Sequence, residues 1–326
     1  MAVKVSIIVP TYKRPALLKR CVEALISQDF PEDEFEIIIV TDGLDEETNN
    51  MLSESAFMDF FSNIFCYSLP FKKGPAAARN AGWRVAKGHL ILFTDDDCIP
   101  SYNWIKNLYN AFEFYGQSAI ALTGKVVVPL SAAPTDFELN TANLETAEFV
   151  TANCACTKSS LELVNGFDEA FTMAWREDSD LEFKFLKEDI PIKKIEEAVV
   201  VHPARKAPWG VSLKEQRKSM FNALLFKKHP QLYKEKIGSP ALRNYYLMII
   251  LLLSALSEWY QHQKIIAIIC FASWLYLMIS FILKRLSNAS LSFKHVTEMV
   301  ATSLLIPFVS VFWNLYGAIK FKALRI

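Results

Sequence analysis

The sequence predicts an α/β protein with a doubly wound, mostly parallel sheet, followed by C-terminal transmembrane helices. Three observations support this prediction. Strand-like and helix-like segments alternate through the first half of the chain. The strands among them are continuous apolar runs, which are typical of parallel strands buried on both faces. Long uncharged stretches follow from about Tyr245 onward.

The first half alternates between two kinds of element. The expected strands are Val3–Val9, Phe35–Val40, Asn63–Ser68, His89–Thr94 and Ala119–Val128. The expected helices are Pro15–Ser27, Ala76–Ala86 and Tyr102–Tyr115. This alternation favours right-handed crossovers and a doubly wound sheet, in which ligands bind beyond the carboxyl ends of the strands.

The segments that follow are less regular. We expect helix and loop at Ala133–Val150, an extended segment at Thr151–Thr157, a helix at Asp178–Lys187 and a short strand at Ala198–Val201. Leu213–Lys228 predicts an amphipathic helix that carries many lysine and arginine residues. Such a helix is typical of an element lying on an anionic membrane surface, with an ordinary solvated face as the alternative.

Composition and charge narrow the classes of function. The chain has 326 residues, of which 52% are hydrophobic, and 35 basic side chains balance 35 acidic ones. A net charge of zero argues against a nucleic-acid partner bound through a general basic field. The N-terminus enters a strand pattern without the features of a signal peptide. We therefore expect the soluble part to stay in the cytoplasm.

Three apolar stretches are candidates for membrane helices. Ile265–Leu283 has 19 residues without a charge, which is about 28 Å as a helix and enough to cross a bilayer core. Met299–Ile319 is interrupted by Pro307, and Tyr245–Ser257 is short but flanked by aromatic residues. Buried core helices are the alternative. Three spans would place the basic tail Lys320–Arg325 outside, against the positive-inside rule, so two or three helices remain open.

Three consecutive acids follow the expected strand at His89–Thr94. Asp95, Asp96 and Asp97 at the end of a buried strand repel one another and lose hydration, so a cation or another partner must compensate. Carboxylate oxygens of this type suit Mg²⁺ or Mn²⁺, with a substrate phosphate completing the shell. The alternative is an N-cap for the helix at Tyr102–Tyr115, although a cap uses one acid.

Two further segments have polar side chains that suit a ligand. Gly74–Gly82 contains small residues and Arg79, whose planar donor fork suits a phosphate or a base edge. Close packing of a helix on the sheet explains the same segment. A second acidic cluster, Glu177-Asp178-Ser179-Asp180, lies far downstream. Acids in the first turn of a helix also favour its macrodipole, which is the alternative there.

Six motifs together resemble the family 2 glycosyltransferases, which have the GT-A fold. They lie in the family's order between about residues 3 and 205: Val5–Arg14, Val40–Gly43, Gly74–Gly82, Phe93–Pro100, Gly166–Glu169 and Trp175–Leu181. Each motif alone is common, whereas the ordered set is specific.

The resemblance implies a role for each matching residue. Asp178 matches the general base of the inverting members, with Glu177 supporting it. Asp95 and Asp97 match the outer acids of the metal-binding DxD motif, and His202 lies where related enzymes sometimes have a further metal ligand. The implied donor-binding residues are Pro10, Thr11, Tyr12, Arg14, Asp42, Arg79, Asp95 and Asp96. The implied cofactor is Mn²⁺ or Mg²⁺.

The resemblance also implies an activity and a location. An inverting enzyme of this kind moves a sugar from a nucleotide-sugar donor to an acceptor hydroxyl or phosphate, here on a lipid-linked or cell-envelope glycan. The QxxRW motif of processive synthases is absent, since Gln216–Met220 does not match it, and this favours transfer of a single sugar. The expected place is the inner membrane, with the catalytic domain facing the cytoplasm. The alternatives are a catalytically silent nucleotide-sugar-binding subunit and a metal-dependent nucleotidyltransferase.

The expected domains follow from these assignments. Residues 1–210 form the GT-A catalytic domain, in which about 1–125 bind the nucleotide-sugar and about 126–210 face the acceptor. Residues 211–240 form the basic interfacial helix, and residues 241–326 form the membrane region with two or three helices.

Overall fold

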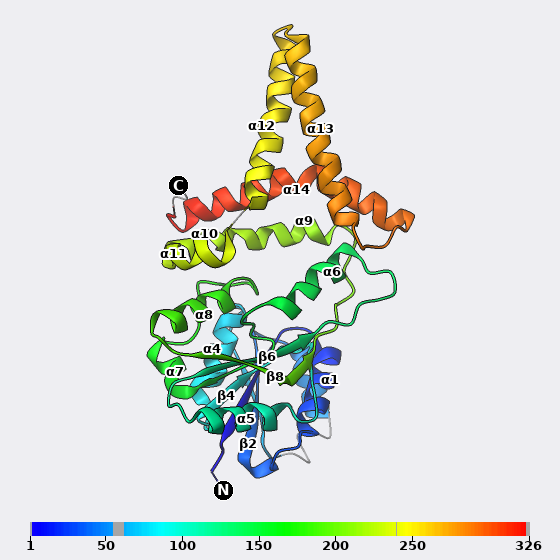
Figure 1. The fold of residues 1–326 in the computed structure, drawn as a ribbon. Coiled ribbons are helices and arrows are strands. Elements are labelled where there is room, and N and C mark those ends of the chain that lie inside the picture. The colour runs from blue at the N-terminus through cyan, green and yellow to red at the C-terminus, as the bar shows by residue number, and fades with distance from the viewer. Residues whose placement is uncertain (1, 55–61, 239, 324–326) are drawn as a thin grey trace. The chain divides into compact units, whose positions relative to one another are not determined.

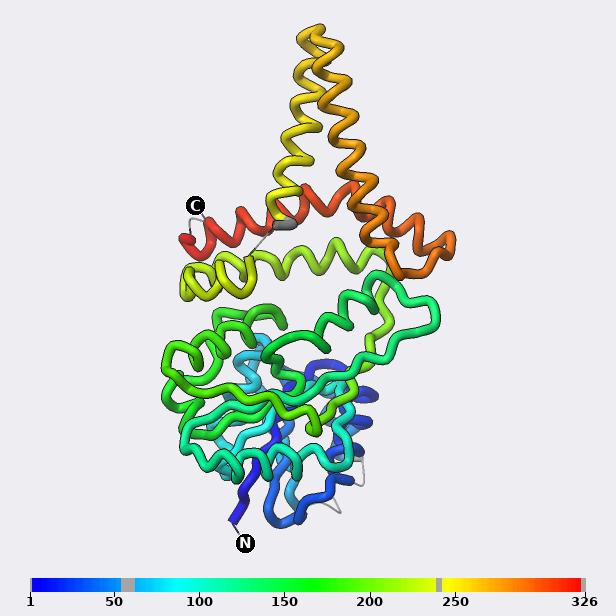
Figure 2. The backbone as a smooth tube through the Cα atoms, viewed as in Figure 1, coloured from blue at the N-terminus to red at the C-terminus, as the bar shows by residue number. Residues whose placement is uncertain are grey.

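The structure is a computed structural model that describes residues 2–54, 62–238 and 240–323. The chain forms two compact units. Unit 1 comprises Met1–Pro129 and Ala142–Pro203, and unit 2 comprises Leu130–Thr141 and Ala204–Ile326. Residues 130–141 therefore belong to unit 2, although they lie between two segments of unit 1 in the sequence (Figures 1 and 2).

Unit 1 contains an eight-stranded sheet in the order β3-β2-β1-β4-β7-β6-β8-β5. The strands are β1 (Val5–Thr11), β2 (Phe35–Thr41), β3 (Ile64–Ser68), β4 (Leu90–Phe93), β5 (Ile99–Pro100), β6 (Ala121–Val127), β7 (Cys154–Thr157) and β8 (Ile192–Val201). The first four in the sheet order are parallel, β7 runs antiparallel to both of its neighbours, and β6 is parallel to β8. All side chains of β1 and β2 are buried, as expected for strands covered on both faces.

Helices connect and cover these strands (Figure 1). They are α1 (Pro15–Ile26), η1 (Glu32–Glu34), α2 (Glu46–Glu54), α4 (Pro75–Val85), α5 (Trp104–Tyr115), η2 (Asn143–Thr146), α7 (Lys158–Leu163) and α8 (Glu177–Lys187). The small residues of α4 allow close packing on the sheet. A Cβ atom at Gly82 would lie 2.5 Å from Cγ2 of Ile8, so a larger residue there would push α4 away from β1.

The predicted α/β class and mostly parallel sheet are confirmed. Two details of the predicted elements were wrong. The last strand is longer than the predicted Ala198–Val201, because it pairs with β6 from Ile192 onward across a register shift. The helices α2 and α7 were not predicted, because each is short, although the side chains of Asp45 and Thr157 cap their N-termini.

Unit 2 is helical. Its elements are α6 (Asp136–Ala142), α9 (Val211–Glu215), η3 (Gln216–Met220), α10 (Phe221–Lys228), α11 (Pro230–Leu232), η4 (Tyr233–Ile237), α12 (Pro240–Tyr260), α13 (Lys264–Leu286) and α14 (Phe293–Lys320). The predicted single helix Leu213–Lys228 is thus three consecutive segments, with a 3₁₀ turn in the middle. The turn lies where α14 comes closest, since a Cβ atom at Gly317 would be 2.2 Å from the carbonyl oxygen of Met220.

Two of the described helices are long and apolar enough to cross a membrane, α13 and α14. The short apolar stretch at Tyr245–Ser257 lies inside α12. It is long and apolar enough to count as a candidate span only when Leu242–Tyr260 is combined with Pro230–Ile237, which is inclined to it by 82°. By length and composition, the chain thus has two or up to three candidate spans.

Candidate active site

The polar residues predicted at the strand ends gather at one edge of the sheet in unit 1. Because β1, β2 and β4 are parallel and adjacent, their carboxyl ends meet. Asp96, just after β4, accepts hydrogen bonds from Oγ1 of Thr11 at 2.7 Å and from Nη1 of Arg14 at 3.0 Å. Burial raises the pKa of Asp96, and the charge of Arg14 opposes this shift. The carboxylate of Asp96 therefore fixes the segment between β1 and α1.

Asp42, after β2, fixes the start of α4. Its carboxylate accepts the backbone N–H of Lys73 at 2.7 Å and that of Gly74 at 2.9 Å. Gly74 has φ 106°, and a Cβ atom there would lie 2.5 Å from the carbonyl oxygen of Thr172. Only glycine meets both conditions without strain. The contact also brings the segment before α8 against the N-terminus of α4.

Arg79 connects the two acidic motifs. This residue of α4 is fully buried. Its Nη2 donates to Oδ1 of Asp95 at 2.7 Å, and its Nη1 donates to Oε1 of Glu177 at 3.2 Å. Nε of Arg79 and Oε2 of Glu177 are buried and have no hydrogen-bond partner among the described residues. The guanidinium thus binds one carboxylate that follows β4 and one from the first turn of α8.

Glu177 and Asp178 form the first turn of α8. The helix starts after Arg176, whose φ of 75° turns the chain sharply. Burial raises the pKa of Glu177 to about 7, and the charge of Asp178 contributes to this shift. Burial also raises the pKa of Asp178 above its usual value. Asp178 is half-buried, and the backbone N–H of Ser179 donates to its Oδ1 at 2.7 Å. Its carboxylate is thus accessible to a substrate but poorly hydrated.

Asp97 and His202 come together through the pairing of β5 with β8. Ile99 lies opposite Val201 in this antiparallel pair, so the residues before Ile99 meet those after Val201. Nε2 of His202 lies 3.5 Å from Oδ1 of Asp97. The buried Cys98 completes a group whose ligand atoms all lie within 4.8 Å of one another.

This group fits a divalent metal. A carboxylate and an imidazole that face each other are metal ligands, and Nδ1 of His202 has no hydrogen-bond partner within the described part of the chain. Burial raises the pKa of the Cys98 thiol well above its usual value, which makes it a poor ligand for a hard ion. The carboxylate oxygen of Asp97 is the ligand type that Mg²⁺ and Mn²⁺ share.

Comparison with known proteins finds a family model that matches the first part of the chain. Residues 6–128 match the model of glycosyl transferase family 2. Unit 1 carries a family 2 glycosyltransferase domain. Glycosyltransferase AglE of Haloferax volcanii is 28% identical over 120 residues, which cover 37% of this chain and 36% of AglE. The poly(ribitol-phosphate) beta-glucosyltransferase of Bacillus spizizenii is 31% identical over 120 residues, which cover 36% of this chain and 18% of that enzyme. The matches thus span about a third of AglE and less of the second relative.

Solved structures share the fold of this chain. Mannosyltransferase PcManGT from Pyrobaculum calidifontis, in complex with GDP-Man and Mn²⁺, has a TM-score of 0.61 at 17% identity and covers 97% of this chain and 88% of its own. S. aureus TarS 1–349 in complex with UDP has a TM-score of 0.53 at 15% identity, with 98% and 91% covered. These similarities confirm the predicted GT-A fold.

Unit 1 brings together most of the residues predicted for the site. Thr11 and Arg14 meet Asp96, Arg79 meets Asp95 and Glu177, and Asp97 meets His202. Pro10 is buried within β1, and Tyr12 lies under the ammonium of Lys72, which is 3.7 Å from its ring centroid. The functions assigned to these residues stay predictions.

Sequence reasoning missed Asn80. Its Nδ2 donates to the carbonyl oxygen of Phe167 at 2.9 Å and to Oε1 of Glu169 at 3.0 Å. Its Oδ1 accepts the backbone N–H of Phe167 at 3.0 Å. Asn80 thereby fixes the Gly166–Glu169 turn on α4. The position of Asn80 beside Arg79 in the Gly74–Gly82 motif was the only hint in the sequence. It does not reveal that the side chain of Asn80 binds the Gly166–Glu169 turn.

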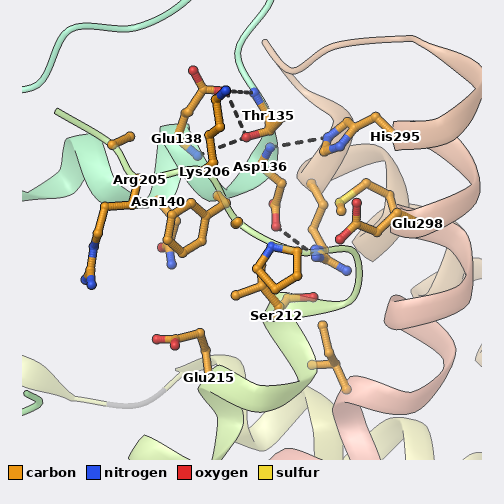
Figure 3. A pocket seen from close by; sticks show the side chains of 18 of the residues that line it. Thr135, Asp136, Glu138, Asn140, Arg205, Lys206, Ser212, Glu215, His295 and Glu298 are labelled. Carbon is orange, nitrogen blue, oxygen red and sulfur yellow. Dashed lines mark hydrogen bonds and ion pairs between the residues drawn. The ribbon is translucent and has the colours of Figure 1, made fainter. Parts of the chain in front are cut away.

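Unit 2 has a cavity of its own, of about 690 Å³ (Figure 3). None of the site residues predicted above lines it. Asp136 of its wall accepts from Nη2 of Arg285 at 2.8 Å, and the backbone N–H of Asp136 donates to Nε2 of His295 at 3.2 Å. These contacts attach residues 130–141 to α13 and α14 and so explain why that segment belongs to unit 2.

Proposed function

We propose that this protein is a metal-dependent, inverting glycosyltransferase that moves a single sugar from a nucleotide-sugar to an acceptor hydroxyl or phosphate. The acceptor is a lipid-linked or cell-envelope glycan. The observation that carries the proposal is the bridge from Asp95 through Arg79 to Glu177. It places the acids after β4 and the acids of α8 within the span of one guanidinium, as a reaction between two substrates requires.

The donor side of the proposed site lies at the carboxyl ends of β1, β2 and β4. Thr11, Arg14 and Asp42 line this edge, and their positions are fixed by hydrogen bonds to Asp96 and to the start of α4. The complexes of two structural neighbours with UDP and with GDP-Man support a nucleotide-sugar as the donor. Neither neighbour identifies the nucleotide base or the sugar of the donor that this protein uses.

Asp97 and His202 would hold the metal, with Asp95 facing the same edge while bound to Arg79. A bound Mn²⁺ supplies charge that offsets the diphosphate as it leaves. Arg79 orients Asp95 through their ion pair of 2.7 Å.

Asp178 is the proposed general base. It is half-buried in the first turn of α8. In its ionised form it accepts the proton of the acceptor hydroxyl. Glu177, immobilised on Arg79, orients the first turn of α8. Attack on the side opposite the diphosphate then inverts the anomeric centre. The place of the reaction is the cytoplasmic face of the inner membrane, with unit 2 as the anchor.

A donor screen tests the proposal. Full-length protein in detergent is incubated with UDP-, GDP- and dTDP-sugars, with Mn²⁺ or with chelator. Release of nucleoside diphosphate that needs Mn²⁺ and is abolished in Asp97→Asn supports the proposal. Binding of a nucleotide-sugar without release, even with membrane extract as acceptor, contradicts it in favour of a silent binding subunit. Release of pyrophosphate from a nucleoside triphosphate and a sugar phosphate identifies a nucleotidyltransferase instead.

A further inference from the structure

The faces of α14 differ from those of a helix in a water-soluble protein, because the buried face mixes polar and apolar residues and the exposed face is apolar. Its buried residues recur every three or four positions and include His295, Thr302, Ser303, Ser310 and Asn314. Nine large apolar residues of α14 are exposed, and they are Phe293, Val300, Leu304, Leu305, Phe308, Phe312, Leu315, Tyr316 and Ile319. An apolar face of this size is stable only when something other than water covers it.

The buried face of α14 is packed along a charged partner. The contacts start at the backbone N–H of Gly210, which donates to Oε1 of Glu298 at 2.7 Å. They continue with Gly317 against Met220 and end at Lys227, whose Nζ donates to the carbonyl oxygen of Phe321 at 2.9 Å. α14 therefore lies alongside α9, η3 and α10 through most of its length (Figure 2).

This packing is incompatible with α14 crossing a bilayer. If α14 spanned, the segment from α9 to α10 would have to lie in the hydrocarbon core as well. That segment carries Lys214, Glu215, Arg217, Lys218, Lys227 and Lys228. Charged side chains at the bilayer centre are costly and rare. At the membrane surface, the same lysine and arginine residues would meet anionic headgroups.

α12 and α13 have the features of a membrane hairpin. They are antiparallel neighbours that lead away from α14 (Figure 1). Among the described side chains of α13, those of Ala267 and Met278 alone are buried. With 21 and 23 residues, the two helices are each about 31–35 Å long, which matches a hydrocarbon core.

The charges of the hairpin lie mainly at its base. Arg243 of α12 and Lys284 and Arg285 of α13 lie at this end, as do the basic residues of α9 and α10. The tip has Glu258 and Lys264, one acid and one base, beside the interfacial aromatic residues Trp259 and Tyr260. Two crossings keep the base, the basic helices and Lys320 on one side, which satisfies the positive-inside rule.

We propose that α12 and α13 cross the membrane as a hairpin, whereas α14 lies in the plane of its anionic surface with its apolar face in the lipid. The chain then crosses twice, and residues 1–238 and 287–326 share one side. This proposal does not depend on sugar transfer, because it rests on packing and charge within unit 2.

Cysteine labelling tests the topology. In a Cys66→Ser/Cys270→Ser background, the remaining four cysteines are buried. Gln261→Cys, Ser287→Cys and Lys322→Cys each place one exposed thiol at the tip, the base and the C-terminal side of α14. A membrane-impermeant maleimide is applied to sealed vesicles of either orientation. We expect Ser287→Cys and Lys322→Cys to react from the same side and Gln261→Cys from the other. Reaction of Ser287→Cys and Lys322→Cys from opposite sides overturns the proposal.

A depth measurement tests whether α14 lies in the membrane plane, and it does not need the label at Gln261→Cys. Nitroxide labels are placed in the same background at Val300, Leu304, Phe308 and Leu315 on the exposed face, and at Ser310 on the buried face. The full-length protein is reconstituted into vesicles that contain an anionic lipid. We expect the four apolar positions to report one shallow depth in the lipid, and the buried Ser310 to be shielded from both lipid-soluble and water-soluble relaxants. A depth that rises to a maximum near Phe308 and falls again would mean that α14 spans.

Discussion

Nη1 of Arg79 donates to Oε1 of Glu177 at 3.2 Å, across 98 residues of sequence. Both side chains are buried. The same guanidinium holds Asp95 through its other terminal nitrogen. Arg79, which the sequence placed on the nucleotide side, therefore also links the two acidic motifs to each other.

Replacing Arg79 should destabilise unit 1 as well as the site. Arg79→Ala leaves the buried Glu177 and the partly exposed Asp95 without their cation, and removing one partner of a buried ion pair typically costs about 3–5 kcal/mol. The control is Arg84→Ala, which breaks an exposed pair with Glu169 and should cost about 0–1 kcal/mol. Chemical denaturation of the detergent-solubilised protein measures both. Equal free energies of unfolding for the two variants would contradict the structural bridge.

Asp97 and His202 should determine metal affinity. Because outer-shell partners of a metal already cost about 10–100-fold when lost, Asp97→Asn and His202→Gln should each weaken Mn²⁺ binding by about tenfold or more. Asp33→Asn, on the exposed η1, is the control. Calorimetric titration with Mn²⁺ in the presence of a nucleoside diphosphate measures the affinity. Wild-type affinity in both site variants would show that the metal binds elsewhere.

Asp42 should affect donor affinity through the start of α4. Asp42→Ala removes the acceptor for two backbone N–H groups, each of which makes a charge-assisted hydrogen bond worth about 1.5–3 kcal/mol. We expect the affinity for a nucleoside diphosphate to fall by about tenfold or more, and Asp42→Asn, which keeps an oxygen acceptor, to lose less. If both variants bind like wild type, the Asp42 carboxylate has no part in the donor pocket.

On the acidic side, turnover should begin to fall at a pH higher than the pKa of an exposed carboxylate. Burial raises the pKa of both Glu177 and Asp178, that of Glu177 to about 7. The base acts in its ionised form, so kcat should fall with decreasing pH at a higher pH than for an exposed aspartate. Because the charge of Asp178 adds to the shift of Glu177, this fall belongs to the pair. A kcat that stays constant from pH 8 to pH 5 at saturating donor would contradict this assignment.

The strand ends were predictable from the sequence, because buried apolar runs such as Val3–Val9 determine both a strand and the edge at which its polar residues emerge. The partners of those residues were not. Asp97 meets His202 only through the pairing of Ile99 with Val201, and β5 is too short to give a sequence signal. Length and composition also describe a spanning and an in-plane α14 equally well, since the difference lies in which face is buried.

The central claim is that Asp178 is the base of a sugar-transfer reaction, and Asp178→Asn tests it most directly. This variant keeps the shape of the side chain and removes its basicity. Sugar transfer and donor binding are measured on the same preparation, in membranes that contain the native acceptor, with Glu188→Gln at the end of α8 as control. We predict a loss in rate of about 10²–10⁴-fold with unchanged donor affinity. Transfer at the wild-type rate, or loss of donor binding, would contradict the claim.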